Sequence, residues 1–224
     1  MNTSVVPKES ASLIIIKNTA KSAKILMGKR NSFHRFMPNK IVFPGGKLDE
    51  IDIKTSDQIR KIPGFKKLSL SNNQLDKHLA HYFCALREAY EETGVVIGCD
   101  NYNFFTDKCL KSRELSDYPS IDKIKLIARA ITPPHSKIRF DNKFFLVNAK
   151  YISNYNSINS NELLDIDWYD LDKIINLDIP AITKNIIKLL KINIKTSEEN
   201  RYRNISIPLY YTSKNKKKVK WLKR

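Results

Sequence analysis

The sequence contains little cysteine and no long apolar segment. Cys84, Cys99 and Cys109 are the three cysteines among 224 residues, and no two of them have the CxxC spacing. An odd number of cysteines without paired spacing argues against both a disulfide framework and a structural zinc site. The longest unbroken aliphatic run is 13–16 (LIII), whereas a membrane-spanning helix needs about 18 apolar residues. We therefore expect a cytoplasmic chain that carries no secretion signal and does not enter a membrane.

Acidic residues are also in short supply. The chain has 40 Lys and Arg against 23 Asp and Glu, a formal net charge of +17. Such a charge attracts polyanions, whether nucleic acid, an acidic membrane surface or a phosphate-rich small molecule, although frequent use of Lys at the surface explains it equally well. The segment 214–224 has seven positive residues out of eleven. We expect a solvated basic tail there, with a nucleic-acid contact through Trp221 as the alternative.

The hydropathy pattern predicts a mixed sheet covered by helices, an α/β fold. With 42% hydrophobic and 28% charged residues the chain is globular in composition, and its length favours one core. The clearest helix has apolar residues at spacings of three and four from Leu75 to Tyr90, with Asn72 or Asn73 as a possible N-cap and Gly94 as its C-cap. The stretch from 53 to about 73 shows no period and is interpreted as an insertion. Strands are predicted at 11–17, 24–27, 41–43, 124–131, 143–149 and 164–169, and a second helix at 181–192.

The clearest helix carries three carboxylates on one face. At about 100° per residue, Glu88, Glu91 and Glu92 lie opposite the apolar stripe that contains Leu86 and Tyr90. Carboxylates one turn apart can converge on a hard divalent cation. The alternative is a solvated acidic helix face.

A second motif upstream joins this helix to a known family. The segment 43–46 (FPGG) and the segment 87–95 (REAYEETGV) together resemble the Nudix box. Gly46 fits its first position, and Asp52 stands where the family usually has Glu. The second half begins at Arg87 instead of position 60, an excess of 27 residues. Arg60 occupies the nominal position, but the segment 61–64 (KIPG) that follows it supplies no carboxylates.

One Nudix branch, the acyl-coenzyme A diphosphatases, is similar in having an insertion at this place. Enzymes of this kind that act on coenzyme A also carry an upstream pattern with two arginines before FPGG. Arg30 and Arg35 keep that register, whereas Gly28, Asn31 and Asn39 depart from it. The departures leave the catalytic class unchanged and weaken the substrate assignment.

The resemblance implies a Nudix-fold α/β/α sandwich with a mixed sheet, formed by one domain over 1–213 with an insertion at about 53–79, followed by the basic tail 214–224. It also implies Mg²⁺ or Mn²⁺ as cofactor. The implied roles are catalysis by Glu91, Glu88 and Arg87; metal binding by Glu88, Glu92, Glu91 and the Gly46 carbonyl; substrate binding by Arg30, Arg35 and Gly45; support of the helix by Asp52; and an additional acidic residue at Glu162.

The implied reaction is hydrolysis of the diphosphate bridge in a nucleoside diphosphate linked to another group. Cations suit this reaction because they neutralise the phosphate oxygens and lower the pKa of the attacking water. Coenzyme A or an acyl-coenzyme A is the favoured substrate. ADP-ribose, a dinucleotide and capped RNA remain alternatives, as does a non-catalytic nucleotide- or RNA-binding module. The oligomeric state stays open.

Overall fold

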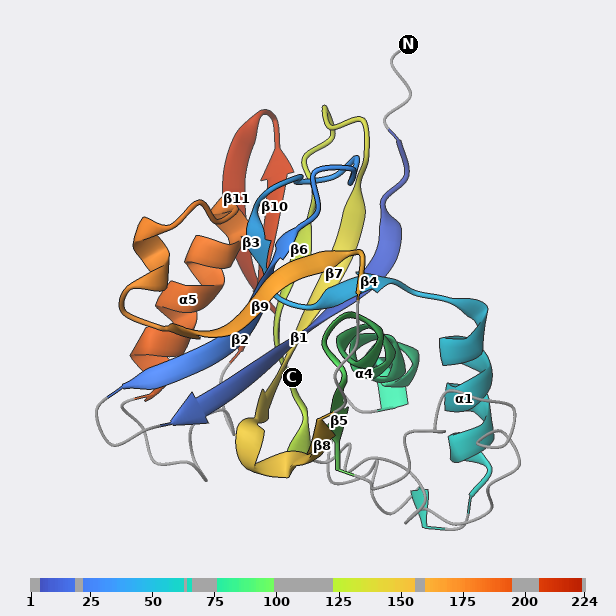
Figure 1. Ribbon diagram of the computed structural model, residues 1–224. Helices are drawn as coiled ribbons and strands as arrows, with labels where there is room; N and C mark the ends of the chain where they lie inside the picture. Colours follow the sequence, from blue (N-terminus) through green and yellow to red (C-terminus); the bar gives the residue numbers. More distant parts are fainter. Residues whose placement is uncertain are drawn as a thin grey trace.

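The computed structural model describes residues 5–18, 22–62, 64–65, 76–98, 123–155, 160–194 and 206–222. Within these ranges the main element is a mixed nine-stranded sheet (Figure 1). Its strands are β1 (Lys8–Asn18), β2 (Ala23–Arg30), β3 (Ile41–Val42), β4 (Gly45–Lys47), β6 (Lys125–Ile131), β7 (Phe140–Asn148), β9 (Leu163–Asp170), β10 (Ile207–Ser213) and β11 (Lys216–Leu222). They are arranged in the order β11-β10-β6-β7-β1-β2-β3, with β4 paired to β1 and β9 to β2.

Helices cover both faces of this sheet. α1 (Glu50–Arg60) and α4 (Leu79–Thr93) lie on one side, and α5 (Ala181–Ile194) lies on the other (Figure 1). A small second sheet pairs β5 (Val95–Ile97) with β8 (Ile152–Tyr155), and two short 3₁₀ helices cover Ala149–Tyr151 and Ile174–Asn176. The predicted α/β/α sandwich with a mixed sheet is confirmed.

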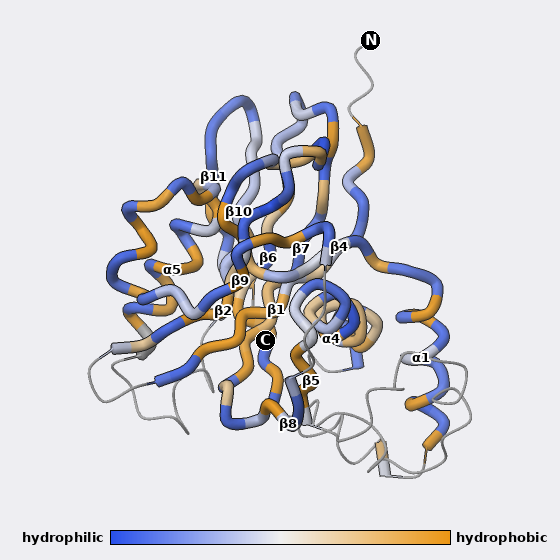
Figure 2. The backbone as a smooth tube through the Cα atoms, viewed as in Figure 1, coloured by the Kyte–Doolittle hydropathy of each residue, from blue (hydrophilic) through white to orange (hydrophobic). Residues whose placement is uncertain are grey.

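The aliphatic run of the first strand is explained by its central position. Successive side chains of β1 point to opposite faces, so Leu13 and Ile15 join the core under α4 while Ile14 and Ile16 join the core under α5. All four are at most 4% exposed. A strand buried on both faces is apolar without alternation, and Figure 2 shows this hydrophobic segment (orange) between the helices.

The opening hairpin and the acidic helix have the form that the sequence predicted. β1 pairs antiparallel with β2, and both extend the expected strands at their ends. α4 ends at Gly94, whose φ of +73° is left-handed and whose amide donates to the Tyr90 carbonyl. Its N-cap is His78, while the expected start of the helix at Leu75 and both asparagine caps lie outside the described residues.

One helix contradicts the interpretation of the stretch after residue 53 as patternless. α1 begins after Asp49, whose side chain and that of Asp52 form a reciprocal capping box. The buried face of this helix consists largely of small polar residues, among them Thr55 and Ser56, while Ile53 is 45% exposed. The hydropathy pattern therefore gives no helical period, although the helix has one buried face and one exposed face.

The segment interpreted as a basic tail is mostly a strand. β11 pairs antiparallel with β10 along its whole length, from Ser213 opposite Lys216 to Ile207 opposite Leu222. The turn residues Lys214 and Asn215 both have positive φ, 48° and 56°, as the tight two-residue hairpin turns that match strand twist require. The expectation missed this hairpin because lysine is a poor strand former by composition; Lys223 and Arg224 lie outside the described residues.

In the described part of the chain, no helix is both long enough and apolar enough to cross a membrane. Cys84 is a buried free thiol on α4, and Cys99 and Cys109 lie outside the described residues.

Candidate active site

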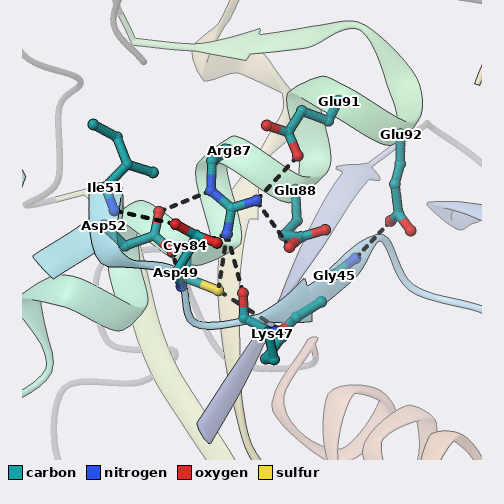
Figure 3. A network of polar contacts seen from close by, with 11 residues as sticks. Gly45, Lys47, Asp49, Ile51, Asp52, Cys84, Arg87, Glu88, Glu91 and Glu92 are labelled. Atoms are coloured by element: carbon teal, nitrogen blue, oxygen red, sulfur yellow. Dashed lines mark hydrogen bonds and ion pairs between the residues drawn. The ribbon is translucent and has the colours of Figure 1, made fainter. Parts of the chain in front are cut away.

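The glycine turn and the acidic helix meet in space. β4 lies beside β1, with Gly46 opposite Ala11, and α4 passes over it. The Gly45 amide donates a 2.7 Å hydrogen bond to Oε2 of Glu92 (Figure 3). A Cβ atom placed on Gly46 would lie 2.4 Å from the carboxylate of Glu88. Two segments 42 positions apart in sequence thus form one site.

The two glycines are required for different reasons. A Cβ on Gly45 would lie 2.4 Å from the backbone oxygen of Ala11, so any side chain there would push the turn off the sheet. The three atoms nearest to a Cβ on Gly46 all belong to the end of the Glu88 side chain. The absence of a side chain at Gly45 therefore lets the turn pack against β1, and its absence at Gly46 leaves space for the Glu88 carboxylate.

This difference predicts opposite outcomes for two matched alanine variants. We expect Gly46→Ala to keep its melting temperature within a few degrees while its affinity for Mn²⁺, measured by calorimetry, falls because Glu88 is displaced. We expect Gly45→Ala to lose stability, because backbone atoms must move. Normal Mn²⁺ affinity in Gly46→Ala would contradict the placement of Glu88 in a cation site.

Arg87 is the centre of a buried polar network (Figure 3). Its Nε and Nη2 donate to the two carboxylate oxygens of Asp52 at 2.9 and 2.8 Å. Nη1 donates to Glu88 at 2.9 Å and to Glu91 at 3.0 Å, and Nη2 also donates to the Lys47 carbonyl at 3.1 Å. Burial opposes its charge, but the hydrogen bonds and charge of Asp52 raise the pKa of Arg87 above its ordinary value. The guanidinium joins α1, β4 and α4.

Two carboxylates at this site are largely withdrawn from water: Glu92 is 3% exposed, and the side chain of Glu88 is 13% exposed. Desolvation raises the pKa of Glu88 to about 7, against the attraction of Arg87. Desolvation likewise raises the pKa of Glu92 to about 8, against the hydrogen bond from the Gly45 amide. The side chain of Glu91 is 53% exposed. Two carboxylates held out of water, with too little positive charge nearby, favour either a proton or a cation.

The structure modifies the expectation that three helix carboxylates converge. Among the described residues, no group of three or more His, Cys, Asp or Glu side chains is arranged to hold a metal ion. Glu88 and Glu91 both turn toward Arg87, while Glu92 turns toward Gly45. The residues nevertheless fit a hard divalent cation, because Glu88, whose carboxylate lies against Gly46, and the buried Glu92 supply oxygen donors of the kind that Mg²⁺ and Mn²⁺ prefer.

Arg30 and Glu162 lie close enough to the buried carboxylates to act on them electrostatically. The charge of Arg30 lowers the pKa of Glu92, and the charge of Glu162 raises the pKa of both Glu88 and Glu92. The Nε atom of Arg30 is buried and has no hydrogen-bond partner among the described residues. Arg35 is exposed on the loop after β2, and no contact among the described residues ties it to the carboxylates.

A pocket at the loop after β2 was not expected from the sequence. It encloses about 430 Å³ and is lined by Asn31, Phe33, His34 and Asn161. The side chain of Asn31 holds its shape by donating to the Asn161 carbonyl at 3.0 Å and accepting from the Phe33 amide at 3.3 Å. Phe33 is 90% exposed. A single aromatic in a polar loop gives no pattern, so only its exposure beside a pocket marks it.

The fold is that of a known superfamily. No family model matches the sequence. The crystal structure of a NUDIX hydrolase from Alicyclobacillus acidocaldarius superposes with a TM-score of 0.64 at 22% identity, over 87% of this chain and 98% of that one. The chain has the Nudix fold. The NUDIX domain of Shewanella oneidensis NrtR, solved with ADP ribose, superposes with a TM-score of 0.50 at 12% identity, over 85% of this chain and 90% of that one.

Two curated proteins are similar in sequence to this Nudix-fold chain. Putative nudix hydrolase 7 from Caenorhabditis elegans is 27% identical over 62% of this chain and 44% of its own length. Acyl-coenzyme A diphosphatase NUDT19 from Xenopus laevis is 28% identical over 39% of this chain and 29% of its own length. The chain thus spans less than half the length of both relatives. The resemblance to Nudix hydrolases, including the acyl-coenzyme A diphosphatase branch, is confirmed.

The split Nudix box is assembled as one unit. Asp52, at the position where the family usually has Glu, reaches Arg87 in the second half despite the 27 extra residues between the halves. Gly46 of the first half lies against Glu88 of the second. Arg60 instead pairs with the exposed Asp57 and Asp76, away from this network.

Proposed function

We propose that the chain is a divalent-cation-dependent hydrolase that cleaves the diphosphate bridge of a nucleoside diphosphate linked to another group. Coenzyme A or an acyl-coenzyme A is its favoured substrate. One observation carries the proposal: the Gly45-Gly46 turn lies against the carboxylates of Glu88 and the buried Glu92, beside the guanidinium of Arg87. The negative charge of a diphosphate repels an attacking hydroxide. Its hydrolysis therefore needs cations, which carboxylate oxygens beside a fixed backbone turn can bind.

Glu88, Glu92 and the Gly46 carbonyl would hold the cation. When bound, it would neutralise the diphosphate oxygens and lower the pKa of the attacking water. Arg87 positions Glu88 and Glu91 through hydrogen bonds of 2.9 and 3.0 Å. Glu91, the more exposed of the helix carboxylates, is available as a further ligand or as the base whose oxygen accepts the water proton.

The loop after β2 would bind the nucleotide. The unpartnered Nε of Arg30 is suited to a phosphate oxygen, and Arg35 is free to reach a second phosphate. Two findings support coenzyme A as the substrate: both arginines keep the register of Nudix enzymes that act on it, and the similar NUDT19 is an acyl-coenzyme A diphosphatase. ADP-ribose is the second candidate, because it is bound in the NrtR NUDIX domain.

A substrate panel with product analysis tests this proposal. Coenzyme A, an acyl-coenzyme A, ADP-ribose, a dinucleoside polyphosphate and capped RNA would be incubated with Mg²⁺ or Mn²⁺, and the products separated by chromatography. We expect coenzyme A to give 3′,5′-ADP and phosphopantetheine, with no cleavage after chelation. Nucleotide binding without cleavage of any substrate would support a binding module instead.

Phe33 is expected to contribute to binding more than to chemistry. Its exposed ring lines the pocket at the loop after β2, where it can stack on a nucleobase. We expect Phe33→Ala to raise KM about tenfold with little change in kcat, since stacking is worth roughly 1–3 kcal/mol per base. Phe33→Tyr keeps the ring and should restore KM. A fall in kcat alone would contradict this role.

A further inference from the structure

The β10–β11 hairpin is strongly basic and lies outside the proposed active site. The segment 207–222 contains five lysines and no acidic residue. β11 is the terminal strand of the nine-stranded sheet, and its residues from Lys216 to Trp221 are all exposed. In the sheet order, β11 lies four strands from β1, a separation of about 19 Å at the usual strand spacing. The hairpin is therefore a separate surface at the far edge.

The two faces of β11 differ in character. Side chains alternate along a strand, so Lys216, Lys218 and Lys220 form a row on one face. Lys217, Val219 and Trp221 lie on the other face, and Trp221 stands opposite Pro208. The Trp221 side chain is 57% exposed and Val219 is 50% exposed. An accessible indole ring thus shares its face with Lys217, while three lysines lie on the opposite face of the same strand.

Protection of a free sheet edge explains only part of this arrangement. Lysines on an edge strand discourage pairing with other chains, but a half-exposed tryptophan works against that purpose. An acidic membrane surface would use the same charges, yet peripheral binding needs a broad apolar face, and β11 exposes only Val219 and Trp221. An accessible aromatic ring on a lysine-rich strand is instead a combination that binds single strands, by stacking on a base and neutralising phosphates.

We propose that the β10–β11 hairpin binds single-stranded nucleic acid. Lys216, Lys218 and Lys220 contact successive phosphates along one face of the strand. Trp221 stacks on a base at the other face, near the end of the strand. This surface works independently of the proposed hydrolase site, because the two are separated by the strands between β11 and β1.

Fluorescence anisotropy with a short labelled single-stranded RNA tests the proposal. Lys218→Gln/Lys220→Gln should lower the affinity and reduce the slope of log affinity against log salt by about 1.4, at about 0.7 per lost phosphate contact. The matched control removes the same charge at two exposed lysines, Lys61, which is the C-cap of α1, and Lys77, which follows Asp76, the partner of Arg60. That control should leave the slope unchanged.

The role of the indole ring is tested separately. Trp221→Ala should lower RNA affinity about tenfold with an unchanged salt slope, and Trp221→Phe should retain most of the affinity. Because Ile207 and Leu222 anchor the hairpin in the core, both variants should melt as the wild type does. Hydrolysis of the small-molecule substrates of the panel by these variants should be unaffected.

Three results would overturn the proposal. The first is an RNA affinity that all hairpin variants share with the wild type. The second is equal loss in the Lys61/Lys77 control, which would show a general charge effect. The third is hairpin-dependent binding to phosphatidylserine vesicles without binding to RNA, which would assign the surface to a membrane. Failure of the hydrolase proposal would leave the RNA measurements unchanged.

Discussion

Glu92→Gln is expected to abolish hydrolysis while making the metal-free protein more stable at alkaline pH. Glu92 is 3% exposed and accepts a hydrogen bond from the Gly45 amide, which the glutamine oxygen can also accept. Removing a cation ligand should lower turnover more than about a hundredfold, since even partners one step removed from a metal cost roughly 10–100-fold. One substitution therefore separates function from stability.

The pH dependence has a definite sign. Burial raises the pKa of Glu92 to about 8, so between its unfolded pKa of about 4.3 and about 8 the folded chain binds a proton that the unfolded chain releases. The stability from this group is complete below the lower value and is lost as the pH rises through about 8. Glutamine does not titrate, so the variant should lack this loss.

Urea unfolding at pH 6 and pH 9, with and without Mn²⁺, measures this difference. Mn²⁺ should stabilise the wild type at pH 9 and have little effect on Glu92→Gln. Glu91→Gln is the matched control: the side chain is half exposed, so its stability should follow the wild type with pH. If Glu92→Gln and the wild type lose stability equally at pH 9, the carboxylate is not a buried charge that a cation compensates.

Arg87→Met should be the most destabilising substitution near the site. The change removes both hydrogen bonds that the guanidinium donates to the buried Asp52. It also removes the ion pair between Arg87 and Glu88. Breaking a buried ion pair on one side costs about 3–5 kcal/mol of unfolding free energy. The double variant Arg87→Met/Asp52→Asn should recover part of that loss, because Asn carries no charge and can still accept the Asp49 amide.

Arg60→Met is the natural control for this measurement. Arg60 also pairs with two aspartates, Asp57 and Asp76, but all three side chains are exposed by more than a third. Exposed pairs contribute about 0–1 kcal/mol. Comparable losses in the Arg87 and Arg60 variants, measured by urea unfolding, would contradict the view that Arg87 holds the site together.

The sequence predicts those parts of the molecule whose residue pattern follows from burial. The helix stripe from Leu79 to Tyr90, the Gly94 cap and the first hairpin all have such patterns. α1 was missed because its buried face is built from Thr55 and Ser56, and small polar side chains leave no hydropathy signal. β11 was missed because exposed lysines are as typical of an edge strand as of a solvated tail, so composition alone does not distinguish the two.

The sequence predicts which residues form the candidate site but not the directions in which their side chains point. Helical spacing places Glu88, Glu91 and Glu92 on one face, and the family pattern adds Gly46 and Arg87. The direction in which each carboxylate turns depends on Arg87 and on the Gly45 amide, and these partners come from another part of the chain. Phe33 was missed for a similar reason, because exposure beside a pocket is a property of the folded molecule.

Asp52 belongs at once to the capping box of α1 and to the ion pair with Arg87. The long insert is therefore attached to the domain at two points, at the first turn of α1 and again where the chain enters α4. Loop-closure entropy grows slowly with length, so doubling the number of residues between two fixed ends costs only about 0.6 kcal/mol. The insert can therefore be lengthened, shortened or replaced, provided that an acidic residue remains at position 52 to pair with Arg87.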